Sequence, residues 1–554
     1  MEIWLGRLVV DLIRELGLGN AQLANTTSSM DFVKGVRGLF DEEIESSLSQ
    51  LDTLDQLAVS LHNIQRQLDL SINNVALTRS LDVRIAVTPG RLVFGIPELA
   101  TRTFPQISGL TFAYLLDEFE NLSEDQQRYV NTLVREKQLP TTFVIGSRQF
   151  GLRTQETLSA GEENKQGSEF DLVVLEDAYR TSDKYYHSFC ERIIRKRLDA
   201  AGVDVYRPER LDAYFSKPLG GVSGLEERAR IHVSECLGDQ DERPWIIRLK
   251  DQLLQWSPGQ DIGKIIEEVR FPSSPLHEKF AVLLVYRSWA DGNDPLREAR
   301  QFRFRIEALA NGARVGDDLA TTYKHYRGDL YAQLVSQLRR PQEYHGIDDF
   351  VLMSGYLPRN LLVLLKQVTR WSLFLGEHPF RGELISSKAQ TEGVREASNW
   401  FLSDSKGLGR IGEETELAVR RLGGLFRDMR FADKPVEVSC SSFSTDRRGL
   451  TDRAIAVLDN AVSHSLILKV PTGRRERNTH VLQHKYQLNP MLAPLFDLSV
   501  ARRGTANFTP EQLVALFDPS VDAEHFIAER TRLLARLNAP FSTPTPQPAL
   551  DFSE

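Results

Sequence analysis

Two adjacent acidic residues, Asp117 and Glu118, close an apolar run and have the types and spacing that phosphoryl chemistry needs. The run, residues 110–116, has the length and composition of a buried strand of a parallel sheet. The carboxyl ends of such strands form the edge where open α/β folds bind ligands. One carboxylate there could hold Mg²⁺ through its waters, and the next could polarise a water that attacks phosphorus. The alternative is a strand that ends in a solvated acidic turn.

Two polar residues could act with this pair, because Ser147 and Arg148 follow the next apolar segment, residues 141–146. Ser147 could hydrogen-bond the attacking water or the terminal phosphate, and its alternative role is to cap a turn. Arg148, like Arg153 in the same predicted loop, could stabilise charge in phosphoryl transfer on a neighbouring subunit. The alternative for both arginines is a solvated loop side chain.

A third candidate, Arg359, follows Pro358 in the first turn of a predicted helix. Side chain and helix dipole both favour an anion there, so Arg359 could bind an anionic group. The alternative is a surface arginine that pairs with Asp348 or Asp349.

Three separated segments resemble motifs of one protein family, the origin-recognition-type AAA ATPases, in particular the prokaryotic members. Residues 117–122, with Gln126, Gln127 and residues 130–133, resemble the Walker B segment. Residues 142–148, with Gly151 and Thr154, are similar to the sensor-1 segment, and residues 354–362 resemble the lid helix with the sensor-2 arginine. The order matches, and the similarity extends loosely from the first residues to about residue 515.

This resemblance implies roles for the candidate residues and ligands for the protein. It implies that Asp117 binds Mg²⁺ and that Glu118 activates the attacking water. It also implies the sensor-1 role for Ser147 and a position in the lid of an ATP site for Arg359. It also implies a winged helix near the C-terminus.

The phosphate-binding loop that such a site needs, G-x-x-x-x-G-K-[ST], does not occur in the 554 residues. In the family this loop lies upstream of the helix that begins the present sequence, together with a central strand of the sheet. Two explanations compete: the start of the chain is assigned too far downstream, or the loop has been lost. The retained acid pair and Arg359 favour the first explanation. Without that strand, neighbouring strands would expose apolar edges.

The family resemblance and the local sequence patterns together predict an α/β protein of several domains. The expected fold is an incomplete AAA-type P-loop NTPase core, a parallel sheet with flanking helices, followed by a helical lid and a C-terminal winged helix. The predicted divisions are a helical part of the core (1–105), the core with Walker B and sensor 1 (106–240), a helical insertion (241–345), a helical lid with sensor 2 (346–430), a winged-helix-like domain (431–520), and a terminal helix with a disordered tail (521–554).

Local patterns add two expectations for the core. Residues 83–87 and 92–94 form short β-like runs around Pro89 and Gly90, which predicts a hairpin or a loop–strand unit. Residues 169–177 predict a last core strand.

A basic segment follows in the predicted winged helix. Residues 466–505 contain seven Lys or Arg against two acids, and Arg474, Arg475 and Arg477 lie between two predicted strands. These arginines could contact the phosphates or the minor groove of duplex DNA. The alternative is an exposed hairpin made soluble by charge.

Composition excludes several protein classes. A formal net charge of −8 argues against a protein that coats nucleic acid over its whole surface. The widely separated Cys190, Cys236 and Cys440 form neither a disulfide framework nor a zinc cluster. Because no apolar run reaches the length of a membrane span and no signal peptide is recognisable, we expect a cytoplasmic protein without a membrane partner.

We therefore expect an ATPase that uses ATP and Mg²⁺ to engage DNA or a protein partner and that hydrolyses ATP poorly without the phosphate loop. A homo-oligomer is a further expected partner arrangement. The alternative, from another class, is a catalytically inactive DNA- or protein-binding adaptor that keeps the ATPase scaffold.

Overall fold

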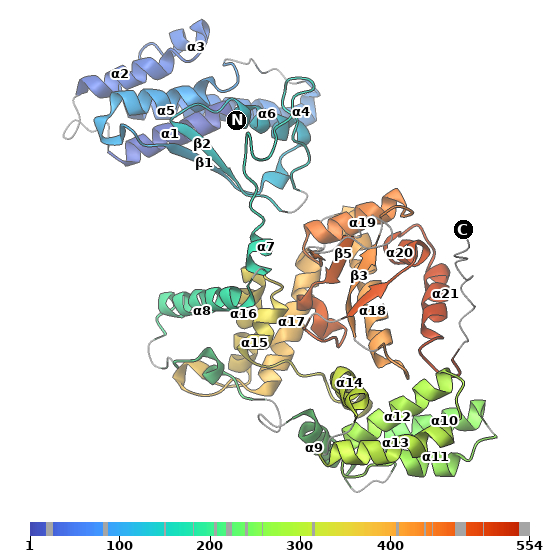
Figure 1. Cartoon of the computed structure of the whole chain (residues 1–554). Coiled ribbons are helices and arrows are strands. Elements are labelled where there is room, and N and C mark those ends of the chain that lie inside the picture. Colours follow the sequence, from blue (N-terminus) through green and yellow to red (C-terminus); the bar gives the residue numbers. More distant parts are fainter. Residues whose placement is uncertain are drawn as a thin grey trace. The chain divides into compact units, whose positions relative to one another are not determined.

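The computed structural model divides the chain into two compact units, Met1–Val173 and Val174–Glu554, drawn from blue to teal and from teal to red in Figure 1. Each unit is described by itself. The structure describes residues 1–17, 26–80, 83, 87–148, 151–180, 182–203, 206, 208–217, 224–238, 242–257, 259–312, 316–405, 409–436, 439–445, 447–470, 484–501 and 504–541.

The first unit combines helices with one pair of parallel strands. Strands β1 (Phe112–Leu116) and β2 (Thr141–Ile145) pair so that Tyr114 lies opposite Phe143. The helices of this unit are α1 (Glu2–Glu15), α2 (Thr26–Arg37), α3 (Glu42–Ser47), α4 (Leu54–Thr78), α5 (Arg91–Thr103) and α6 (Glu124–Arg135). Apolar residues of α1, α2, α4 and α5 form one core with Tyr114 of β1 and Leu133 of α6.

The two faces of the parallel pair differ in burial. Tyr114 points into the core, and its hydroxyl donates to the carbonyl of Val93 on α5, 3.0 Å away. On the other face Leu115 is 74% exposed and Val144 57% exposed. Parallel sheets are normally covered on both faces, so this apolar face is unusual for a sheet of this type.

The β-like run at residues 92–94 is helical, which corrects the hairpin expected there; residues 84–86 lie outside the described part of the chain. Helix α5 begins after Gly90, whose φ is +83°. The carboxylate of Glu2 accepts the N–H groups of Gly90 (2.5 Å), Leu92 (3.0 Å) and Val93 (3.2 Å). The free N–H groups at this helix start are satisfied by a side chain distant in the sequence. This tertiary contact stabilises a helix where the local pattern favours a strand.

The last core strand expected at residues 169–177 is also wrong. The described backbone has no strand there, and helix α7 (Leu175–Arg180) begins within the segment. Leu172 and Val173 are 55% and 70% exposed. An apolar run becomes a strand only where a neighbouring strand takes up its hydrogen bonds.

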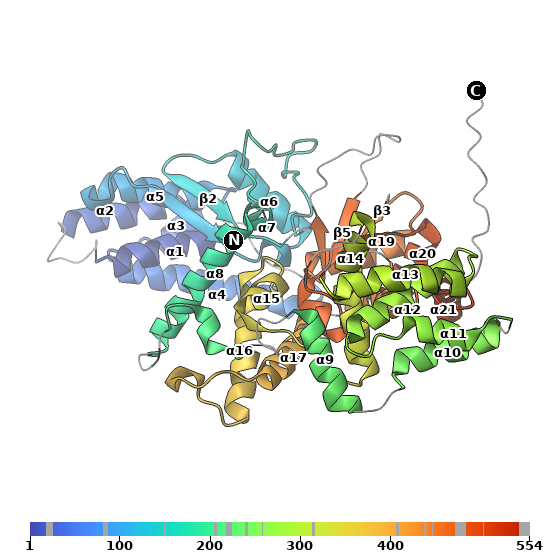
Figure 2. The same cartoon turned by 60° about the horizontal axis from the view of Figure 1, so that its bottom comes forward.

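The second unit contains two apolar cores. The first is built by α9 (Leu225–Leu237), α10 (Pro244–Trp256), α11 (Ile262–Val269), α12 (Pro275–Ala290), α13 (Pro295–Ala310) and α14 (Asp317–Gln337), which are grouped together in Figures 1 and 2. The second is built by α8 (Asp183–Ala200), α15 (Gly346–Met353), α16 (Pro358–Phe374), α17 (Ser387–Ser405), α18 (Gly409–Phe431), α19 (Asp452–Ser463), α20 (Pro510–Phe517) and a sheet. Helix α21 (Ala523–Leu534) packs against this second core.

A buried ion pair joins these two cores. Arg430 of α18 donates to Asp329 of α14 at 2.7 Å, and both side chains are buried. Beside it, Gln333 of α14 donates to the carbonyls of Arg430 and Ala432. Separating the two cores would break this pair and leave buried charges uncompensated, so the pair opposes their separation.

The sheet of the second unit has the order β4-β5-β3-β6. Its strands are β3 (Cys440–Thr445), β4 (Ile467–Val470), β5 (His484–Leu488) and β6 (Gly504–Asn507). β5 runs antiparallel to both β4 and β3, whereas β6 runs parallel to β3. The two strands predicted on either side of the basic segment are confirmed as β4 and β5, and helix α19 (Asp452–Ser463) precedes them.

Among the described residues, we find no helix that combines the length and the apolar character needed to cross a bilayer.

Candidate nucleotide site

The acid pair lies at the carboxyl end of β1, next to the end of β2. Backbone pairing continues past the strands, because the Gly146 N–H donates to the Leu116 carbonyl (2.8 Å) and the Phe119 N–H donates to the Gly146 carbonyl (3.1 Å). Asp117 is thereby held against Gly146, where a Cβ would lie 3.1 Å from Asp117 Oδ1. The parallel register therefore brings Asp117 and Glu118 beside Ser147, although these residues are distant in sequence.

Glu118 is held in an uncommon backbone conformation. Its φ is +54°, a left-handed conformation that non-glycine residues rarely adopt. Its N–H donates to Asp117 Oδ1 (2.9 Å), and its Oε2 accepts from Asn121 Nδ2 (3.0 Å). Both carboxylates are exposed. Strain of this kind collects at functional sites, and here it fixes the direction of a carboxylate.

The two loop arginines contact the acidic turn of their own chain. Arg148 Nε lies 3.2 Å from Glu120 Oε1, and the Arg148 N–H donates to Glu120 Oε2. Arg153 Nη2 donates to the carbonyl of Glu120 at 2.9 Å. The Ser147 hydroxyl donates to the carbonyl of Arg148 (3.1 Å) and is exposed. Gly151 permits this approach, because a Cβ there would clash with Ser147 Oγ.

Gln127 of α6 joins the two strand ends, a role that sequence reasoning missed. Its side chain is fully buried; Nε2 donates to the carbonyls of Phe119 (3.2 Å) and Gly151 (2.9 Å). Its Oε1 accepts the N–H of Arg153 at 2.9 Å. The sequence does carry a signal: Gln127 stands at the same helical spacing as the buried Val130 and Val134, a position where an apolar residue is expected.

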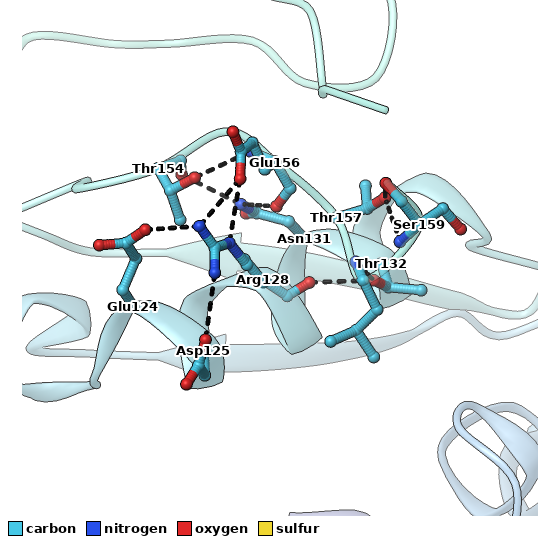
Figure 3. A network of polar contacts seen from close by, with 10 residues as sticks. Glu124, Asp125, Arg128, Asn131, Thr132, Thr154, Glu156, Thr157 and Ser159 are labelled. Atoms are coloured by element: carbon cyan, nitrogen blue, oxygen red, sulfur yellow. Dashed lines mark hydrogen bonds and ion pairs between the residues drawn. The ribbon is translucent and has the colours of Figure 1, made fainter. Parts of the chain in front are cut away.

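A polar network on the next turns of α6 fixes the segment after β2 (Figure 3). Arg128 pairs with Glu124 (2.7 Å) and Asp125 (3.2 Å) on its own helix and with Glu156 (2.9 Å) across from it. Asn131 Nδ2 donates to the carbonyls of Thr154 (3.0 Å) and Glu156 (2.9 Å). The segment that carries Arg153 is therefore held by side chains rather than by a strand ladder.

This donor set fits Mg²⁺ held through water. Mg²⁺ in nucleotide sites is bound by one or two carboxylates, phosphate oxygens and waters, and Asp117 and Glu118 are exposed carboxylates of the kind such a site would need. Among the described residues, no group of three or more His, Cys, Asp or Glu forms an all-protein metal site. Two exposed carboxylates at one strand end would fit a metal that arrives with a phosphate ligand and waters.

Arg359 lies in the second unit, in the first turn of α16 after Pro358. Its side chain is 71% exposed, lies 3.4 Å from Asp404 Oδ2 and stands over the ring of Trp400. The acid that pairs with it is thus Asp404 of α17. Asp348 instead contacts His187, and Asp349 accepts the N–H of His345.

Arg474, Arg475 and Arg477 lie outside the described residues. The strands that flank them are β4 and β5, with Leu468 opposite Gln487.

Comparison with protein-family models gives one match, to the ORC-CDC6-like family, over residues 1–508. The chain belongs to the ORC-CDC6-like family. No curated protein and no solved structure matched the chain. Membership in the ORC-CDC6-like family supports an AAA-type ATPase-related function, of the kind that uses ATP with Mg²⁺.

The candidate residues of this ORC-CDC6-like protein are divided between the two units. The acid pair, Ser147 and Arg148 lie together at one sheet edge, and Arg359 belongs to the other unit. The phosphate-cradling glycine–lysine loop is not among the 554 residues.

Proposed function

We propose that this ORC-CDC6-like protein is an AAA-type ATPase that couples ATP binding and hydrolysis to engagement of DNA or a protein partner. The observation that carries the proposal is the acid pair at the carboxyl end of β1, beside Ser147 at the end of β2. In this proposal Asp117 holds the waters of Mg²⁺, and Glu118, oriented by Asn121, polarises the attacking water.

The remaining site residues act on phosphate charge. Ser147 donates a hydrogen bond to the terminal phosphate, and Arg359 approaches the nucleotide from the lid. Arg148 stabilises charge on the nucleotide of a neighbouring subunit in a homo-oligomer, after exchange of its contact with Glu120. Mg²⁺ supplies charge neutralisation on the phosphates when bound.

We further propose that the phosphate loop and a central strand are encoded upstream of residue 1. The exposed apolar face of β1 and β2 supports this, because Leu115 and Val144 are what a further layer of the core would cover. We also propose a cytoplasmic location, where a reducing environment suits the free thiols of Cys190, Cys236 and Cys440.

The test compares ATP turnover by the protein expressed with its native in-frame upstream sequence and by its Glu118→Gln variant. We expect kcat to fall about 10²–10⁴-fold with ATP binding retained, because the variant keeps the shape but loses the base. Glu136→Gln, an exposed residue just after α6, is the matched control. Equal rates for wild type and Glu118→Gln would refute the catalytic assignment.

A second candidate is the inactive adaptor, which one observation favours: the 554 residues lack the lysine loop. It predicts no ATP binding even with upstream sequence. It also predicts that duplex DNA binding falls steeply with salt and is lost when Arg474, Arg475 and Arg477 are changed to Gln. Retained binding by that triple variant would exclude these arginines as the DNA contact.

A further inference from the structure

The second unit contains an apolar cavity of about 540 Å³ between α8, the short helix η3 (Leu211–Tyr214) and α16. Its lining is almost entirely apolar, and Leu211, Tyr214, Ile347 and Val368 are buried side chains of its wall. None of the residues proposed for the nucleotide site lines it. The volume lies within the range of small-molecule pockets, about 300–1,000 Å³.

Hydrogen bonds within the protein fix the wall of this cavity. The Ile385 N–H donates to the Tyr214 carbonyl (2.8 Å), and the Ser216 N–H donates to the Ile385 carbonyl (2.9 Å). The Tyr214 hydroxyl donates to the carbonyl of Tyr206, 2.8 Å away. These polar groups of the wall are therefore already paired, and the wall offers an apolar surface in a formed shape.

Three cations stand among the lining residues: Arg197 of α8 and Lys366 and Arg370 of α16. All three are exposed. Arg370 lies 3.7 Å from Glu396. No ion pair with a carboxylate is found for Arg197 or Lys366 among the described residues. An apolar cavity edged by unneutralised positive charge is complementary to a molecule with an apolar body and an anionic end.

We propose that this cavity binds a small anionic amphiphile, an apolar chain or ring system that carries a carboxylate or phosphate head. The body lies against Leu211, Tyr214 and Val368, and the head faces Arg197 and Lys366. A nucleobase does not fit, because its ring donors and acceptors would lose their water against this apolar wall without gaining partners. The site is independent of the proposed ATPase activity.

The same helix, α16, links this cavity to the lid arginine. Lys366 and Arg370 follow Arg359 on α16 by two and three turns, respectively. A ligand held at the later turns is thus connected to Arg359 by a continuous helix.

The probes are dodecanoate and dodecyl phosphate, with dodecan-1-ol as the neutral match, titrated into the full chain by calorimetry below the critical micelle concentration. We expect one equivalent of each anion to bind and the alcohol to bind more weakly by about tenfold. Shortening the carboxylate should weaken binding by about fourfold per CH₂. The tighter of the two anions identifies the preferred head group.

Two kinds of variant separate the cavity from surface adsorption. Arg197→Gln with Lys366→Gln should weaken both anions by about tenfold or more and leave the alcohol unchanged. Leu365→Trp should fill the cavity and abolish all binding. Lys196→Gln, an exposed lysine of α8 that does not line the cavity, is the matched control.

Three outcomes would overturn the proposal. Absence of anion binding to wild type, binding of several equivalents that Leu365→Trp leaves intact, or equal affinity in the double charge variant would each exclude the site. Far-ultraviolet circular dichroism of every variant checks the fold, and the charge variants alter exposed side chains only, so their result stands even if Leu365→Trp unfolds.

Discussion

At the scale of single residues, buried polar side chains decide where the candidate catalytic groups lie. Gln127 is the clearest case, because one amide contacts the backbone after β1 and the backbone after β2. A buried amide without partners costs free energy, so such a residue persists only where all its partners are in place.

Replacing Gln127 with alanine should lower the free energy of unfolding by about 2–4 kcal/mol, because it removes the side-chain partner of the Gly151 carbonyl and of the Arg153 N–H and one of the two donors to the Phe119 carbonyl. Urea unfolding followed by circular dichroism measures the change. Gln138→Ala, an exposed glutamine beyond α6, is the control and should change stability by less than about 0.5 kcal/mol. Similar losses of stability in both variants would contradict the role of Gln127 in joining the two strand ends.

Lys279 of α12 provides a prediction on pH. Burial lowers its pKa to about 7, Asp433 opposes the shift and Arg248 adds to it. Its ammonium donates to Gln337 Oε1 at 3.0 Å and faces Trp245. In the unfolded chain the lysine keeps its proton up to about pH 10.4. Between these values the unfolded state binds more protons, so stability contributed by this group rises with pH.

We therefore expect wild type to gain stability relative to Lys279→Met from pH 7 to pH 10, by up to about 1.4 kcal/mol per pH unit. Below pH 7 the difference between the two proteins should be constant. Urea midpoints across this pH range measure it, with the exposed Lys250→Met as control. A flat difference up to pH 10 would show that Lys279 titrates normally.

At the scale of elements, helix termini are positioned by residues far along the chain. Glu2 of α1 takes the free N–H groups at the start of α5 and accepts the Tyr129 hydroxyl of α6. One carboxylate thereby fixes three helices around the core that supports β1.

Glu2→Ala should destabilise the first unit by about 2–4 kcal/mol, because it leaves buried N–H groups of α5 without an acceptor. Glu2→Gln should cost less, since its amide oxygen still accepts. Hydrogen exchange at Leu92 and Val93 reports the helix start directly. The exposed Glu15→Ala, at the other end of α1, is the control. Unchanged exchange at α5 in Glu2→Ala would contradict the capping role.

At the scale of the whole molecule, the apolar cores respect the division between the two units. Among the residues that the structure describes, the two large cores of the second unit contain none before Val174, and those of the first unit contain none after Val173. The first unit leaves an apolar face of its parallel strand pair exposed.

Residues 174–554 expressed alone should fold and unfold cooperatively, because both of their cores are intact. Residues 1–173 expressed alone should bind an apolar dye such as anilinonaphthalene sulfonate and self-associate, because Leu115 and Val144 stay uncovered. Leu115→Lys with Val144→Lys should reduce both effects. Equal dye binding by wild type and this variant would show that the face is not the cause.

The sequence by itself determined the elements that carry their own local signal. The apolar run before Asp117 and the apolar segment before Ser147 are both strands, as their patterns predict. The motifs of the acid pair and of the lid helix also identified the family that the match over residues 1–508 shows.

Only the tertiary structure decided the rest, because those features depend on partners distant in the chain. Residues 92–94 are helical since Glu2 accepts the N–H groups of Leu92 and Val93. Residues 169–177 form no strand since none of the described strands pairs with them. The hydrogen bonds of Gln127 and the cation-edged cavity depend on contacts between segments that are distant in the sequence and that no local pattern predicts. Periodicity records which face of an element is buried, whereas the partner that buries it is set by packing of the whole unit.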